Sequence, residues 1–173
     1  MKRPGKDEYL PYYENYIKLV DDGDIIGILE SQIKQTVSML RAIPDSRGTY
    51  RYAEGKWSIN EVVGHLLDGE RLFSARALRF ARADKTPLPG FEQDDYVREA
   101  DFDKYPLSEL VSELESVRRS TCFLYRHMSD EATARRGTAN NAEVSVRALA
   151  YITAGHEIHH RGVIEEKYKQ ARG

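Results

Sequence analysis

The sequence predicts an all-α protein, a four-helix bundle with a long loop between the second and third helices. Apolar residues recur at spacings of three and four in four separate stretches, which is the period of an amphipathic helix. We find no convincing strand pattern. The proline-containing segment 84–106 separates the second stretch from the third. A connection of that length allows these two helices to run parallel, so we expect an up-down-down-up order.

The first helix is expected to begin near Asp24, a good N-cap, and to end before Pro44. Residues 1–23 precede it as an N-terminal arm. Tyrosines cluster in this arm, and we expect them to pack over the bundle or over a partner subunit: Tyr9, Tyr12, Tyr13 and Tyr16.

The second helix has the clearest start, because Ser58 and Glu61 form the pattern of a capping box. It is expected to end near Arg82. In the long loop that follows, prolines and Gly90 interrupt regular structure, and the aromatic residues are expected to pack on the bundle. Loops of this length in compact domains are often functional.

The third helix is expected to start after Ser108 as its cap, and residues 137–141 resemble a turn. The fourth helix is expected over Ser145 to Lys169.

Composition indicates one globular domain over residues 1–173, since 40% of the residues are hydrophobic and 31% are charged. The net charge of −2, with basic and acidic residues interleaved, argues against a nucleic-acid partner. Cys122 is the only cysteine, so no intramolecular disulfide can form and a reducing cytoplasm is expected. We see no signal peptide and no apolar run that could span a membrane.

Three of the five histidines predict a metal site. His156 and His160 lie one turn apart on the apolar stripe of the fourth helix, where two imidazoles can bind one ion. His65 lies at the edge of the stripe of the second helix, which could bring it to the pair. The alternative is that these histidines are hydrogen-bonded core residues without an ion.

Three imidazoles leave at least one coordination position open, as in catalytic sites. Zinc or nickel suits such ligands, and so do copper, iron and cobalt. His159 is expected beside the site or on the surface, and His127 is expected to interact with a helix C-terminus.

Glu70 lies near the middle of the apolar stripe of the second helix. It is either a general base with a raised pKa or half of an ion pair with Arg161 or another arginine. Glu157 is expected to face outward into solvent.

Other residues near the motifs have structural interpretations. Gly155 and Gly162 flank the histidines, and close approach of a neighbouring helix or of a substrate would explain both. Trp57 is expected to act as a hydrophobic staple rather than to stack on substrate, and Cys122 to be inert.

Two segments resemble the DinB/YfiT-like metalloenzyme family, a damage-inducible family unrelated to the DNA polymerase of the same name. Trp57 to Leu66 matches its W-S-x-x-E-V-x-x-H-L segment, and His156 to Ile164 matches H-x-x-H-H-x-G-x-I. The resemblance extends from about Asp24 to Glu166. Val163 departs from it, because many relatives have glutamine there.

The resemblance implies an up-down-down-up bundle whose metal ligands are His65, His156 and His160. It also implies zinc or nickel as the ion and a homodimer. Some relatives are S-transferases that use bacillithiol, mycothiol or glutathione, and another is a mycothiol-dependent maleylpyruvate isomerase.

We therefore expect a metal-dependent transferase or hydrolase that acts on a small molecule, with a low-molecular-weight thiol as a candidate cosubstrate. Two alternatives are a non-enzymatic metal-binding or stress-related interaction module and a purely structural bundle.

Overall fold

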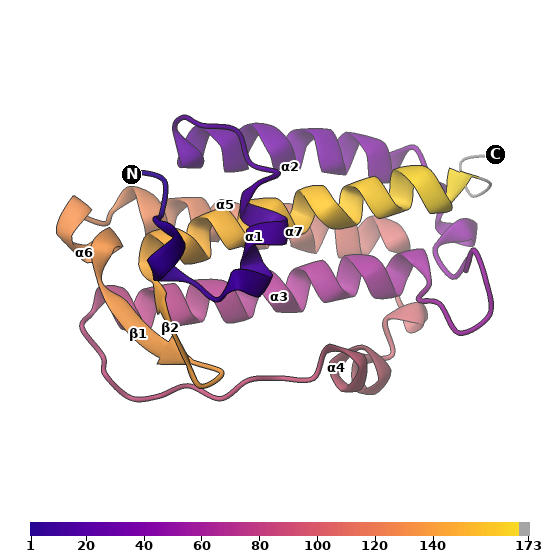
Figure 1. Ribbon diagram of the computed structural model, residues 1–173. Helices are drawn as coiled ribbons and strands as arrows, with labels where there is room; N and C mark the ends of the chain where they lie inside the picture. The colour runs from indigo at the N-terminus through magenta and orange to yellow at the C-terminus, as the bar shows by residue number, and fades with distance from the viewer. Residues whose placement is uncertain (170–173) are drawn as a thin grey trace.

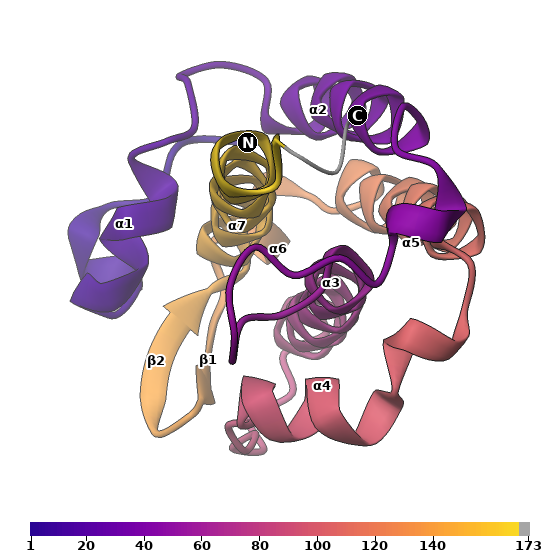
Figure 2. The ribbon, with the colours of Figure 1, turned by 90° about the vertical axis from the view of Figure 1, so that its right-hand side faces the viewer.

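Four long helices form the bundle in the computed structural model, which describes residues 1–169. They are α2 (Ile25–Arg41), α3 (Ile59–Ala81), α5 (Leu107–Arg126) and α7 (Val146–Lys167). Helices α2 and α7 run in one direction and α3 and α5 in the other, so the predicted up-down-down-up order is confirmed (Figure 1). Seen from the end of the bundle, α2 and α3 each pack against both α5 and α7 (Figure 2).

The predicted helix starts are confirmed where the cap is local in sequence. The Asp24 carboxylate accepts hydrogen bonds from the backbone N–H groups of the first turn of α2. Ser58 and Glu61 form the capping box of α3, with the Glu61 N–H donating to Ser58 Oγ at 3.0 Å. Ser145 caps α7 in the same way.

Helix α5 begins one residue before the predicted cap, so the assignment of Ser108 as N-cap is wrong. The N-cap is Pro106, which has no side-chain acceptor. Asp45, in the short 3-10 helix η3 (Asp45–Arg47), takes that role: it accepts from the Ser108 N–H at 2.7 Å and from Ser108 Oγ at 2.9 Å. A cap that comes from 63 residues away leaves no local sequence signal.

The long connection is more ordered than predicted, since it contains helix α4 (Gln93–Ala100) and the 3-10 helix η4 (Phe102–Lys104). Val97 is the one buried residue of α4, so the helix has too few apolar positions to show periodicity. The predicted packing of the loop aromatics holds for Phe102, whose ring covers Gly64 so closely that a Cβ there would lie 2.2 Å from it.

A β-hairpin occupies the segment that was expected to be only a turn. Strands β1 (Arg136–Ala139) and β2 (Ala142–Ser145) pair antiparallel, and the short helix α6 (Asp130–Ala134) precedes them. Asn140 and Asn141 form the two-residue turn with φ of 51° and 59°, as a type I′ turn requires. The strands are four residues each, too short to reveal alternation in the sequence.

The N-terminal arm packs on its own bundle. It contains the 3-10 helices η1 (Lys6–Glu8) and η2 (Pro11–Tyr13) and the single-turn helix α1 (Glu14–Ile17), which lies against α7. Glu8 is buried and accepts two hydrogen bonds from Arg147 of α7, which fixes the arm in place. None of the helices in residues 1–169 is long and apolar enough to cross a bilayer.

The bundle core is divided into two apolar clusters by a layer of buried polar side chains. One cluster surrounds the start of α7 and the end of α3, and the other surrounds the start of α3 and the end of α7. Each long helix contributes at least one polar residue to the layer between them: Gln32, Glu70, Arg118, His156 and Glu157. This layer is where the three predicted metal ligands lie.

Candidate metal centre

Helices α3 and α7 bring His65, His156 and His160 together. A ligating nitrogen from each ring lies within 4.8 Å of the others, and the Nε2 atoms of His65 and His156 are 2.8 Å apart. The ring centroids are separated by 4.5 to 4.8 Å. The structure thus brings His65 to the pair, as expected from its place on the second helix, although the spacing of four on α7 carries no information about His65.

The three imidazoles are held neutral by their surroundings. Burial lowers the pKa of His65 to about 4 and that of His160 to about 3, and it lowers the pKa of His156 well below its usual value of 6.5. The neighbouring imidazoles add to the effect, because each would repel a second positive charge. Near neutral pH the rings are uncharged nitrogen donors, the form in which histidine binds metal ions.

Aromatic side chains surround the imidazoles and limit access of water. The Trp57 ring lies 4.9 Å from that of His65, while Tyr16 and Phe73 pack edge-on against His156 at 5.4 and 5.8 Å. Trp57 thus contacts a candidate ligand, a role that the staple interpretation did not include.

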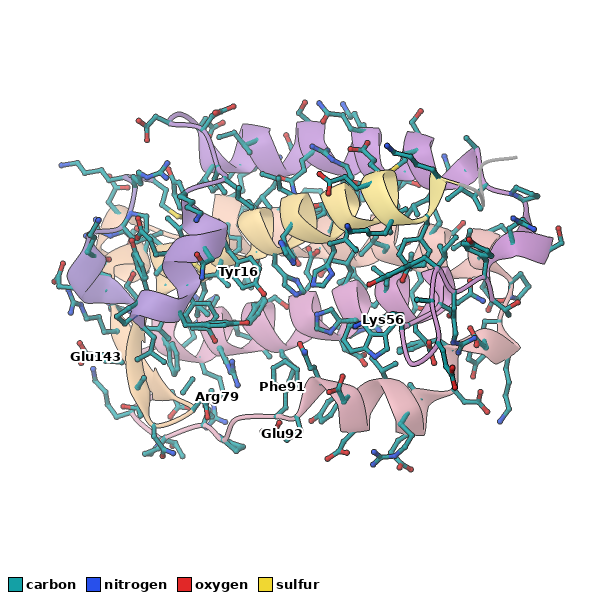
Figure 3. All side chains as sticks on the ribbon, turned by 45° about the vertical axis from the view of Figure 1, so that its right-hand side comes forward. Tyr16, Lys56, Arg79, Phe91, Glu92 and Glu143 are labelled. Carbon is teal, nitrogen blue, oxygen red and sulfur yellow. The ribbon has the colours of Figure 1, made fainter. Side chains whose placement is uncertain are left out.

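A cavity of about 280 Å³ opens on one side of the histidines. His65 and His156 contribute to its wall, the N-terminal arm covers one flank, and residues 90–94 cover another. Tyr16 and Phe91 extend into the region between these segments in Figure 3. A volume of this size suits a small organic molecule rather than a polymer.

A model of the DinB superfamily matches residues 28–164. The chain belongs to this superfamily. It is 25% identical over 134 residues to a protein of Oceanobacillus iheyensis named "putative metal-dependent hydrolase", and the match covers 76% of each chain.

Solved structures share the DinB fold. YfiT from Bacillus subtilis, described as a probable metal-dependent hydrolase with an unusual four-helix bundle topology, superposes with a TM-score of 0.69 at 16% identity over 98% of this chain and 93% of its own. A mycothiol-dependent maleylpyruvate isomerase gives 0.66 at 13% identity, covering 83% of this chain and 61% of that one. A DinB-like protein of Bacillus subtilis, YjoA, gives 0.61 at 21%, covering 83% and 87%.

Behind the histidines of this DinB bundle lies a buried ion-pair cluster. Arg118 donates two hydrogen bonds to Glu70, at 2.7 and 2.8 Å, and its Nη1 lies 2.5 Å from Glu157. The structure therefore shows Glu70 as half of an ion pair. Its partner is Arg118, whereas Arg161 donates to Gln35.

The expectation that Glu157 faces solvent is wrong, because only 2% of the residue is exposed. The first half of α7 is covered by the arm, the hairpin, α2 and α3, so this part of the helix has no solvent face. Helical periodicity in the sequence does not reveal that a second face is also covered.

The remaining predicted residues lie outside the centre. His159 is exposed and packs edge-on against Tyr16, and His127 is the C-cap of α5. Burial raises the pKa of Cys122 to about 11, in agreement with an inert thiol.

Sequence reasoning missed three charged residues that line the cavity, Arg76, Glu92 and Asp94. Arg76 interrupts the apolar stripe formed by Phe73, Ala77 and Phe80, and this interruption was the available signal. Asp94 belongs to α4, which was not predicted, so nothing in the sequence placed it near His65.

Proposed function

We propose that His65, His156 and His160 bind one divalent metal ion, zinc or nickel, and that this DinB protein is a metal-dependent hydrolase of a small molecule. One observation carries the proposal: three neutral imidazoles converge beside a cavity large enough for a small substrate. A bound ion supplies a Lewis acid and lowers the pKa of a water or thiol that binds beside it. Three protein ligands leave room for that molecule.

The surrounding residues have defined parts in this proposal. Trp57, Tyr16 and Phe73 keep the imidazoles oriented and exclude bulk water. Asp94 lines the same cavity, and its negative charge favours a proton on His65. We assign Asp94 as the proton acceptor for the attacking group, and the Arg118-bound Glu70 as a positioning residue.

A second candidate is transfer of a small thiol in place of water. The observation that favours it is the shared fold with the mycothiol-dependent isomerase. The same three imidazoles and open position serve both reactions, because an ion that acidifies water also acidifies a thiol. Activity assays with and without added thiol distinguish the two.

The metal site is tested by measuring the metal content of the purified protein and of three variants, His65→Ala, His156→Ala and His160→Ala. We expect about one ion per chain in the wild type and at least a tenfold loss of affinity in each variant, since even supporting partners of a ligand contribute about 10- to 100-fold. His159→Ala is the matched control, because this exposed neighbour is not in the cluster.

The reaction class is tested with panels of small esters and amides, and with glutathione and bacillithiol conjugation, in the presence and absence of a chelator. Chelator-sensitive hydrolysis supports the hydrolase, and strict thiol dependence supports the transferase. A well-folded protein that binds no divalent ion would overturn both.

A further inference from the structure

One positively charged side chain in the wall of the cavity beside the histidines, that of Arg76, has no part in the proposed reaction. Arg76 lines the cavity together with His65 and His156, and only 6% of this arginine is exposed. Along α3 the two residues His65 and Arg76 are three turns apart on the same face, a rise of roughly 16 Å between their Cα atoms. A helical arginine side chain leans toward the helix N-terminus, which is the direction of His65.

Arg76 is buried without a carboxylate partner. Its Nη2 donates to the Pro89 carbonyl at 2.9 Å, and its guanidinium carbon lies 5.8 Å from the Phe91 ring centroid. Within residues 1–169, no aspartate or glutamate oxygen lies within 4.0 Å of it. The other deeply buried arginine, Arg118, contacts two carboxylates.

Such a group is costly to bury, because a guanidinium has five N–H donors and a full charge. The Pro89 carbonyl satisfies only one of the donors. Burial accordingly lowers the pKa of Arg76. A ligand carboxylate would supply both the missing acceptors and the opposite charge, and the planar guanidinium fork matches it in a bidentate arrangement.

The remaining lining limits what the ligand can be. Phe73 contacts His156, and Phe91 covers Arg76, so an apolar surface lies between the two polar ends. Glu92 and Asp94, both exposed, also line the cavity and disfavour additional negative charge. These features fit a monoanion with an apolar body.

We propose that Arg76 binds the carboxylate of a small organic monoanion whose reactive group lies at the histidines. This inference rests on the proposed function and adds the class of substrate to it. The competing role for Arg76 is structural: its hydrogen bond to the Pro89 carbonyl and its contact with the Phe91 ring would only hold the 89–91 segment against α3.

Ligands that engage both ends of the cavity separate these roles. We suggest the monohydroxamates of succinic, adipic and suberic acid, each compared with its methyl ester, because the hydroxamate binds a divalent ion and only the acid offers a carboxylate. Affinities are measured by calorimetry on the zinc-loaded protein. Arg76→Gln removes the charge, and Arg79→Gln is the matched control, since Arg79 pairs with Asp84 and does not line the cavity.

We expect at least one acid to bind the wild type about tenfold or more tightly than its ester, the usual effect of a charge-assisted hydrogen bond. Arg76→Gln should remove the preference and Arg79→Gln should keep it. If circular dichroism shows that Arg76→Gln has a much lower melting temperature than the wild type, Arg76→Lys is used in its place. This variant should weaken the preference for the acid over its ester.

The inference is overturned if no acid is preferred by the wild type, a comparison that needs no variant, or if the preference survives in Arg76→Gln. Failure of the proposed function has a different signature: the methyl esters would bind equally well with and without zinc. Esters that require zinc, combined with no preference for acids, would reject the role of Arg76 and leave the metal site standing.

Discussion

The Nε2 atoms of His65 and His156 lie 2.8 Å apart although 91 residues separate them in the chain. Both rings are buried, and burial disfavours the positively charged form of each, an effect that the adjacent imidazoles strengthen at His156. This contact links the stability of the fold to the chemistry of the site. We therefore expect acid to destabilise the metal-free protein and a bound ion to stabilise the fold.

The metal-free protein should lose stability as the pH falls below 6.5. In the unfolded chain His65 takes up a proton near pH 6.5, whereas in the folded chain it does so only near pH 4. Protons therefore bind preferentially to the unfolded state in this window, and the free energy of unfolding falls as the pH falls. His65 alone should account for about 3 kcal/mol by pH 4.

Urea unfolding at a series of pH values measures this effect. His65→Gln should reduce the slope of the profile over the same window, because only His156 and His160 then still contribute, while His159→Gln, at an exposed position, should leave it nearly unchanged. A wild-type profile that is flat between pH 6.5 and about 4 would contradict the prediction.

Addition of zinc or nickel should raise the melting temperature, and a chelator should reverse the rise. An ion that binds only the folded state stabilises it by about 2.7 kcal/mol at a hundredfold excess over its Kd, which is about 5–10 °C for a chain of this size. Thermal denaturation followed by circular dichroism measures the shift. His160→Ala should reduce the shift by at least about half, and an undiminished shift in that variant would place the ion elsewhere.

Replacement of Arg118 by methionine should destabilise the protein by about 3–5 kcal/mol, because Glu70 and Glu157 would stay buried without their counter-charge. Arg119→Met is the matched control at an exposed neighbouring position, and it should change stability by less than about 0.5 kcal/mol. Chemical denaturation of both variants measures the difference.

Glu70→Gln separates a positioning role from a general base. If Glu70 only positions neighbouring groups, the variant keeps its metal content and the shape of its pH–rate profile. If Glu70 is the general base, the acidic limb of that profile, in which the base is protonated, disappears while the metal stays bound.

Gly155→Ala and Gly162→Ala should have opposite effects on stability. A Cβ at Gly155 would lie 2.1 Å from the Tyr16 carbonyl oxygen, so alanine must push the arm away from α7. At Gly162 nothing lies within 4 Å, and alanine should gain up to about 1 kcal/mol of helix propensity. Equal unfolding free energies for the two variants in urea would contradict this packing of the arm.

Much of the fold was predictable because its signals are local. Side chains within three residues of the helix start cap α2, α3 and α7, and the spacing of four between His156 and His160 alone places two imidazoles on one face. The expected close approach of a neighbouring helix is confirmed at Gly155, whereas among residues 1–169 no neighbouring helix comes close to Gly162.

What the sequence by itself determined was the set of amphipathic helices, their caps and the histidine pair, since each depends on residues within one or two turns. Only the tertiary structure decided that Asp45 caps α5, that Glu157 is buried against Arg118, and that Arg76 reaches the cavity of the histidines. The physical reason is that helical periodicity marks the face that meets one neighbour. Which other faces are covered, and by which charge, depends on segments that are distant in the chain.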